Sequence, residues 1–134
     1  MLVDTSAWIE FLRATASPSD RALTGLLEEG GPVAVTGVVV QEVLQGCRDE
    51  RQAAEVRSLL LACRIVEPVS PETFDHAAAL YRRCRKAGHT VRGAVDCLVA
   101  AIALEHDLSV LAHDRDFEPL RRHCGLSLYD RLPG

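Results

Sequence analysis

Five carboxylates stand at positions from which they could share a metal ion. Asp4 directly follows a short apolar segment at the start of the chain, and Asp114 and Asp116 directly follow another at 108–112. If both segments are strands of one parallel sheet, their carboxyl ends meet at the same edge, where ligands are commonly bound. The alternative explanation is local: Asp4 would cap the next helix, and Asp116 would cap a short helix after a polar turn.

Glu42 and Asp96 lie in segments that are otherwise strongly apolar. The segment 38–44 reads VVVQEVL, and its apolar character suggests that Glu42 is partly buried and therefore has a partner. Asp96 interrupts a helix at 93–104 that is apolar nearly all round, and a buried carboxylate is costly unless it is paired or bound to metal. The structural alternatives are a solvated Glu42 and an Asp96 that lies in a first helical turn, near the positive end of the helix dipole.

Taken together, these carboxylates predict a site for Mg²⁺ or Mn²⁺. Four or five carboxylates cannot all stay ionised side by side without a countercharge, and hard divalent cations with oxygen ligands provide one. Zinc would favour His or Cys ligands. Such a site can bind a phosphodiester oxygen, activate water and stabilise an in-line displacement. The histidines are scattered and form no Ser/His/Asp or Cys/His arrangement with neighbours in sequence; they are His76, His89, His106, His113 and His123.

The elements that must position these residues alternate between short strands and helices. We expect strands at 1–3, 32–35, 65–69 and 108–112, and a fifth at 126–128. We expect helices at 7–13, 20–29, 38–47, 49–63, 71–87 and 94–105. This alternation predicts an α/β fold with a parallel sheet covered on both faces.

Composition limits the remaining possibilities. A chain of 134 residues with 48% hydrophobic and 25% charged residues predicts one soluble domain over 1–134. The net charge of -4 argues against general coating of nucleic acid, and 4% aromatic residues argue against a platform for base stacking. Five cysteines without a CxxC pair indicate free thiols in a reducing cytosol. With no signal peptide and no membrane span in the sequence, we expect a cytoplasmic protein.

The order of these motifs resembles the PIN-domain family, and most closely the VapC-type toxin ribonucleases of type II toxin–antitoxin pairs. The resemblance rests on VDTSAW at 3–8, Glu42, TVR at 90–92, DCLVAA at 96–101 and DRDF at 114–117. It implies a three-layer α/β/α fold, a Mg²⁺- or Mn²⁺-dependent endoribonuclease, a homodimer and a cognate antitoxin. The residues that match the four acidic positions of the family are Asp4, Glu42, Asp96 and Asp114, with Asp116 as an auxiliary one. Ala112 departs from the pattern, because family members often carry Ser, Thr or His there.

Several other side chains are candidates for contacts at this site. Thr5 and Ser6 could hold a metal-bound water or a phosphate oxygen, or simply cap a helix. Arg92 could neutralise a carboxylate or bind a phosphate. The basic cluster at 82–86 (RRCRK) could meet RNA phosphates or an acidic partner, or be a solvated face. Trp8 and Phe11 are interpreted as core residues or as dimer contacts.

Alternative functions fit less well. An aspartyl phosphatase usually carries a second Asp two residues after its nucleophile, where this chain has Ser6. A phospho-receiver domain needs a late lysine after a strand, whereas the only lysine, Lys86, lies in a predicted helix. The remaining alternative is a catalytically silent PIN-like module that binds RNA or a partner without cleaving.

Overall fold

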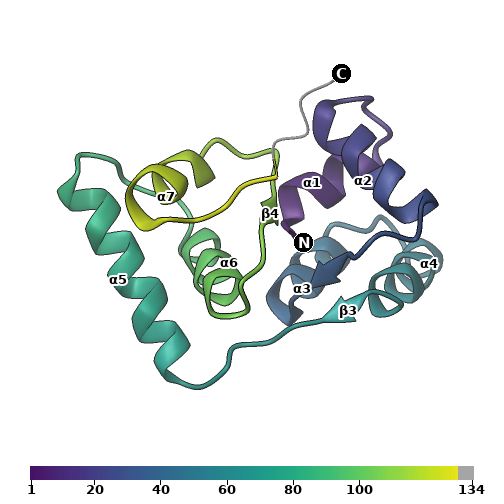
Figure 1. Ribbon diagram of the computed structural model, residues 1–134. Coiled ribbons are helices and arrows are strands. Elements are labelled where there is room, and N and C mark those ends of the chain that lie inside the picture. The colour runs from purple at the N-terminus through teal and green to yellow at the C-terminus, as the bar shows by residue number, and fades with distance from the viewer. Residues whose placement is uncertain (130–134) are drawn as a thin grey trace.

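The computed structural model describes residues 1–129 and contains a parallel four-stranded sheet in the order β3-β2-β1-β4 (Figure 1). Its strands are β1 (Leu2–Val3), β2 (Ala34–Val35), β3 (Arg64–Ile65) and β4 (Val110–Leu111). The helices are α1 (Thr5–Leu12), α2 (Pro18–Glu28), α3 (Gly37–Gln45), α4 (Glu50–Leu61), α5 (Glu72–Lys86), α6 (Ala94–Glu105) and α7 (Phe117–Cys124). The register pairs Leu2 with Ala34 on one side and with Val110 on the other.

The helix ends follow from local chemistry. Ser17 caps α2, its side chain accepting a hydrogen bond from the backbone N–H of Asp20, and Pro18 occupies the first turn, where a missing N–H costs nothing. Asp49 caps α4 in the same way. Gly125 ends α7 in a left-handed conformation with φ of 74°, which favours glycine.

The strand order explains how the helices divide between the two faces of the sheet. The chain moves from β1 to β2 to β3 in one direction and then returns past β1 to reach β4. Because parallel crossovers are right-handed, this reversal places α1–α4 on one face and α5 and α6 on the other. Figure 1 shows these two groups on either side of the sheet, with α7 beside α5 and α6. The predicted α/β/α arrangement is confirmed, and the direction reverses between β1 and β4.

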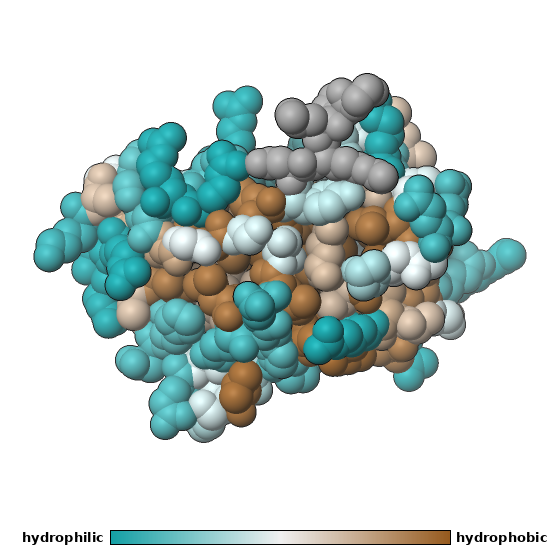
Figure 2. Space-filling model, in the orientation of Figure 1, coloured by the Kyte–Doolittle hydropathy of each residue, from teal (hydrophilic) through white to brown (hydrophobic). Residues whose placement is uncertain are grey.

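The core lies between these layers. The run Val99–Ala103 of α6 is fully buried, and so are both residues of β1. Trp8 is also fully buried and packs edge-to-face on Phe11 at a centroid distance of 5.8 Å. Trp8 is therefore a core residue, and its interpretation as a dimer contact is wrong. Figure 2 shows hydrophobic side chains across the middle of one face, with hydrophilic ones around its edges.

Some elements differ from the sequence-based expectation. The strands are shorter than predicted. Strand β3 overlaps the expected 65–69 segment only at Ile65, and both of its residues are exposed at the sheet edge. The expected fifth strand is a single parallel bridge from Leu128 to Val110. All five cysteines are free, and Cys84 and Cys97 are buried. Among the described residues, no helix is long and apolar enough to cross a membrane.

Candidate metal centre

Three carboxylates gather where the chain reverses direction across the sheet. Asp96 lies in the first turn of α6, Asp114 follows β4, and Asp116 directly precedes α7. Each offers one oxygen, and these three oxygens lie within 4.8 Å of one another. Asp4 follows β1 at the same edge. In open α/β sheets, ligands bind at such a switch point, outside the carboxyl ends of the strands.

Asp96 shows how strongly the negative charges interact. Burial and neighbouring carboxylates together raise the pKa of Asp96 from 3.8 to about 7, and burial has the largest effect. The carboxylates that contribute, in order of effect, are Asp4, Asp114, Asp116 and Glu42. The other four predicted carboxylates therefore all lie close enough to Asp96 for their charges to affect its pKa. Asp4 and Glu42 stand outside the group of three whose oxygens meet within 4.8 Å.

Asp4 caps helix α1 and also lies beside the carboxylate cluster. It is 3% exposed, and its Oδ2 accepts hydrogen bonds from the backbone N–H of Ser6 at 3.0 Å and the Ser6 hydroxyl at 2.7 Å. The first of these bonds caps α1. Burial raises the pKa of Asp4, with a smaller contribution from the charge of Glu42, while the hydrogen bonds oppose that rise. The cap thus holds a poorly hydrated carboxylate beside the cluster.

Ser6 ties the ends of β1 and β4 together. Its hydroxyl donates to Asp4 and accepts from the backbone N–H groups of His113 at 2.9 Å and Asp114 at 3.2 Å. The hydroxyl proton and both acceptor positions are thus used within the protein. The geometry gives Ser6 a role in positioning two carboxylates, and a contact from Ser6 to substrate stays a prediction.

Glu42 is exposed on α3, so the expectation of partial burial is wrong. The reason is that Val39 and Val43 form the buried face of that helix, whereas Glu42 points away from it. Glu42 nevertheless has a partner, because the Thr5 hydroxyl donates to its Oε1 at 2.7 Å. This bond orients the Glu42 carboxylate from the neighbouring helix α1.

The 114–116 turn directs Asp116 toward the cluster. The backbone N–H of Asp116 donates to Asp114 Oδ1 at 2.9 Å, which forms a local Asx-type turn. Asp116 precedes α7 but its side chain makes no capping bond, so the capping explanation does not account for its carboxylate. Arg92 Nε lies 3.7 Å from Asp116 Oδ1, as predicted for neutralisation of a carboxylate. The Arg92 side chain is 86% exposed, so water screens this pair.

Sequence reasoning missed two residues beside the centre. Gly93 allows the Asp96 carboxylate to fold back over the start of α6: a Cβ at this position would lie 3.3 Å from Asp96 Oδ2. Glu10 on α1 lies 3.5 Å from His113 Nε2, beside Asp114. Gly93 could have been recognised from the sequence, because it directly precedes the first turn of a predicted helix. The contact of Glu10 with His113 depends on long-range packing alone.

The donor set fits a hard divalent cation. All the candidate ligands are carboxylate oxygens, which suit Mg²⁺ and Mn²⁺ better than zinc or copper. After burial, the negative charges of the neighbouring carboxylates contribute to the raised pKa of Asp96, so these groups repel one another when all are ionised. A bound divalent cation would reduce that repulsion, and Asp96, Asp114 and Asp116 are placed to hold it.

Comparisons with known proteins agree with this geometry. Residues 1–123 match the sequence profile of the PIN domain. The chain is 35% identical over 127 residues to ribonuclease VapC11 of Mycobacterium tuberculosis, a match that covers 94% of this chain and 95% of that protein.

Solved structures share the fold. VapBC2 from Rickettsia felis, bound to a DNA fragment from its promoter, superposes with a TM-score of 0.72 at 16% identity over 96% of both chains. VapC20 of Mycobacterium tuberculosis, described as a toxin that cleaves the sarcin-ricin loop, has a TM-score of 0.66 at 21% identity. That match covers 87% of this chain and 92% of the other.

Proposed function

The chain belongs to the PIN domain family, and on that basis we propose that it is a Mg²⁺- or Mn²⁺-dependent endoribonuclease acting as the toxin of a toxin–antitoxin pair. The observation that carries this proposal is the meeting of three carboxylate oxygens within 4.8 Å at the switch point of the sheet. A relative with ribonuclease in its name, matched over 94% of the chain, supports RNA as the substrate class.

In this proposal Asp96, Asp114 and Asp116 hold the cation, and Asp4 adds charge from the end of β1. When bound, the cation supplies Lewis-acid chemistry: it stabilises charge on a phosphodiester oxygen and makes water a better nucleophile. Ser6 keeps Asp4 and the backbone of Asp114 in register, so the carboxylates need little rearrangement. We assign Ser6 to this positioning role.

Glu42 is the candidate general base. It is exposed, ionisable and oriented by the 2.7 Å hydrogen bond from Thr5, so it can accept a proton from an attacking water molecule. Attack by water leaves a 5′-phosphate and a 3′-hydroxyl. The competing route through the RNA 2′-hydroxyl usually employs a positioned acid and base, often His. Among the described residues, the histidine nearest the centre in sequence is His113, which is paired with Glu10.

The partners follow from the same relationship. Structures similar in fold include toxin–antitoxin complexes such as VapBC2, and we propose a cognate antitoxin as a partner of this chain. We also propose that the chain forms a homodimer. We further propose that Arg92 binds a substrate phosphate, which its exposed position beside Asp116 supports.

The decisive experiment is to sequence RNA ends formed by the purified protein in Mg²⁺ or Mn²⁺, beside Asp96→Asn and the exposed control Glu28→Gln. We expect new 5′-phosphate ends with wild type and the control, and none with Asp96→Asn or in excess EDTA. Cleavage that persists in EDTA, or ends carrying 2′,3′-cyclic phosphate, would contradict the mechanism. RNA binding without cleavage by the metal-loaded wild type would instead identify the silent PIN-like module.

A further inference from the structure

His113 stands at the rim of the metal centre, and the proposed chemistry gives it no role. It directly precedes Asp114, and its backbone N–H donates to the Ser6 hydroxyl that also bonds Asp4. Its side chain is 49% exposed. The imidazole therefore faces solvent beside a carboxylate that we propose to hold the cation.

Glu10 orients the His113 ring. Glu10 Oε1 lies 3.5 Å from His113 Nε2 and accepts a hydrogen bond from the Thr15 hydroxyl at 3.0 Å. The Glu10 side chain is 18% exposed, so its carboxylate is held against α1. An ionised carboxylate only accepts, so the ring nitrogen that faces it, Nε2, carries a proton. The other nitrogen, Nδ1, is turned away from Glu10, and no partner is found for it among residues 1–129.

The proposed chemistry does not by itself distinguish RNA from DNA. Attack of water on a phosphodiester beside a metal ion makes no use of the 2′-hydroxyl. Selectivity for RNA then requires a contact with the sugar, and the 2′-hydroxyl is the group that lets a protein tell RNA from DNA. This hydroxyl both donates and accepts, so it can bond Nδ1 of a neutral imidazole as donor and Nδ1–H of a protonated one as acceptor.

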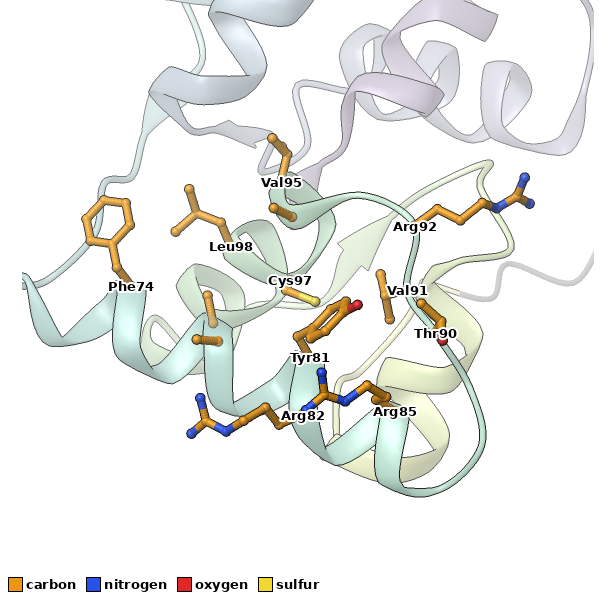
Figure 3. A pocket seen from close by; sticks show the side chains of 13 residues that line it. Phe74, Tyr81, Arg82, Arg85, Thr90, Val91, Arg92, Val95, Cys97 and Leu98 are labelled. Atoms are coloured by element: carbon orange, nitrogen blue, oxygen red, sulfur yellow. The ribbon is translucent and has the colours of Figure 1, made fainter.

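Other polar side chains around the centre suit other contacts. The Ser6 hydroxyl is fully used within the protein, and Thr5 donates its proton to a carboxylate of α3. The Arg92 guanidinium suits a phosphate. Figure 3 shows it extending away from the cavity between α5 and α6, which Thr90 lines. His113 is the side chain at the ends of β1 and β4 that combines exposure with a ring nitrogen open to a sugar.

We propose that His113 is a specificity-determining residue whose Nδ1 hydrogen-bonds the 2′-hydroxyl of a ribose flanking the scissile phosphate. Glu10 is its positioning residue and acts only through the imidazole. This inference rests on the proposed ribonuclease and names the contact by which it selects RNA. A base amino group also has a proton to donate to Nδ1, but that contact would form equally with DNA of the same sequence, so it would not select RNA.

Cleavage of matched oligonucleotides tests this contact. The substrates are a short RNA with a mapped cleavage site, and the same RNA with one 2′-deoxy or 2′-fluoro nucleotide on either side of the scissile phosphate. We expect wild type to cut the unmodified RNA about three- to tenfold faster, in kcat/KM, than the RNA modified at one of these positions, as for one hydrogen bond. His113→Ala should slow cleavage of the unmodified RNA by a similar factor, and the two losses should not add.

Two further variants separate positioning from a general effect on the fold. Glu10→Ala frees the ring and should lower the preference for ribose, whereas a purely structural role would slow cleavage of both substrates alike and leave their ratio unchanged. His76→Ala is the matched control: it removes a second histidine–glutamate contact, with Glu105 at the opposite end of α6, and should leave the ratio at the wild-type value.

The outcomes decide between the alternatives. Equal cleavage of ribose and modified substrates by wild type, a ribose preference that survives His113→Ala, or a preference that follows the flanking base instead of the sugar would each overturn the inference. If no strand is cut, fluorescence anisotropy in Ca²⁺ compares binding of RNA and DNA strands of one sequence. A loss of RNA binding alone in His113→Ala supports the contact while the proposed ribonuclease fails, and an equal loss for both strands, or none, overturns it. Equal cleavage of RNA and DNA refutes this inference alone.

Discussion

Replacing Asp96 by Asn should stabilise the metal-free protein at alkaline pH while abolishing cleavage. The folded protein raises the pKa of Asp96 from 3.8 to about 7, chiefly through burial and then through the charge of Asp4. A carboxyl group with a raised folded-state pKa holds its proton more tightly when folded than when unfolded. It therefore costs no stability below about pH 4, and the cost grows until the folded group has ionised, above about pH 7.

The size of this stability cost follows from the same two pKa values of Asp96. The full difference between 3.8 and about 7 corresponds to roughly 4 kcal/mol. Asp96 is only half-buried, so solvent screening reduces the expected cost to about 1–2 kcal/mol. Asp96→Asn removes this cost, which should raise the melting temperature of the metal-free chain by about 3–8 °C at pH 8. At pH 4 the two proteins should differ little.

The assay is urea denaturation in excess EDTA at pH 4, 6 and 8, followed by the fluorescence of Trp8, the single tryptophan and a fully buried one. Glu28→Gln removes an exposed carboxylate from α2 and should leave the wild-type profile unchanged. Adding Mg²⁺ should then stabilise wild type more than Asp96→Asn, because a ligand that binds the folded state stabilises it.

Two results would refute this reasoning. One is a difference in stability between Asp96→Asn and wild type, measured in EDTA, that does not grow between pH 4 and pH 8. The other is an Asp96→Asn variant that is less stable than wild type at pH 8, which would mean that the carboxylate is a structural element of α6.

Three further variants test individual contacts. Asp4→Ala should lose about 1 kcal/mol of stability through the missing cap while Asp4→Asn keeps it, and both should stop cleavage; equal unfolding midpoints in urea would argue against the cap. Thr5→Val should slow cleavage by about tenfold in single-turnover kinetics, because Glu42 loses its orienting bond, whereas Thr5→Ser should stay near wild type. Gly93→Ala places a Cβ 3.3 Å from Asp96 Oδ2 and should weaken Mn²⁺ binding several-fold by calorimetry; unchanged affinity would show that the carboxylate has room to move.

The sequence made Asp96 conspicuous because its helix is buried on almost every side. In the apolar segment 93–104, the single carboxylate of Asp96 breaks the pattern, and burial supplies the physical reason to look for a partner. Asp4 and Asp114 were predictable for another reason: each follows a strand, and parallel strands end at a common edge. The prediction of the site therefore depended on getting the strands right, and their shortness in the structure did not matter.

Glu42 shows where such reasoning fails. Counting apolar neighbours in 38–44 suggested burial, but only Val39 and Val43 of the described helix are fully buried, and Glu42 faces solvent. Composition within a window cannot reveal which side of a helix meets the sheet. The partner of Glu42, Thr5, belongs to another helix and could be found only from the packing of α1 against α3.

Ser6 is a second residue whose role depends on contacts between segments that are far apart in the sequence. A serine after a strand-ending aspartate is most simply a helix cap, and nothing nearby in the sequence suggests a bond to residues 113 and 114. That bond exists because β4 pairs directly with β1 after the chain has reversed direction across the sheet. The reversal brings the first strand and the last beside one another, so one hydroxyl can hold Asp4 and the backbone of Asp114 together. The geometry of the centre is thus a consequence of strand order, and its chemistry a consequence of the residues that follow those two strands.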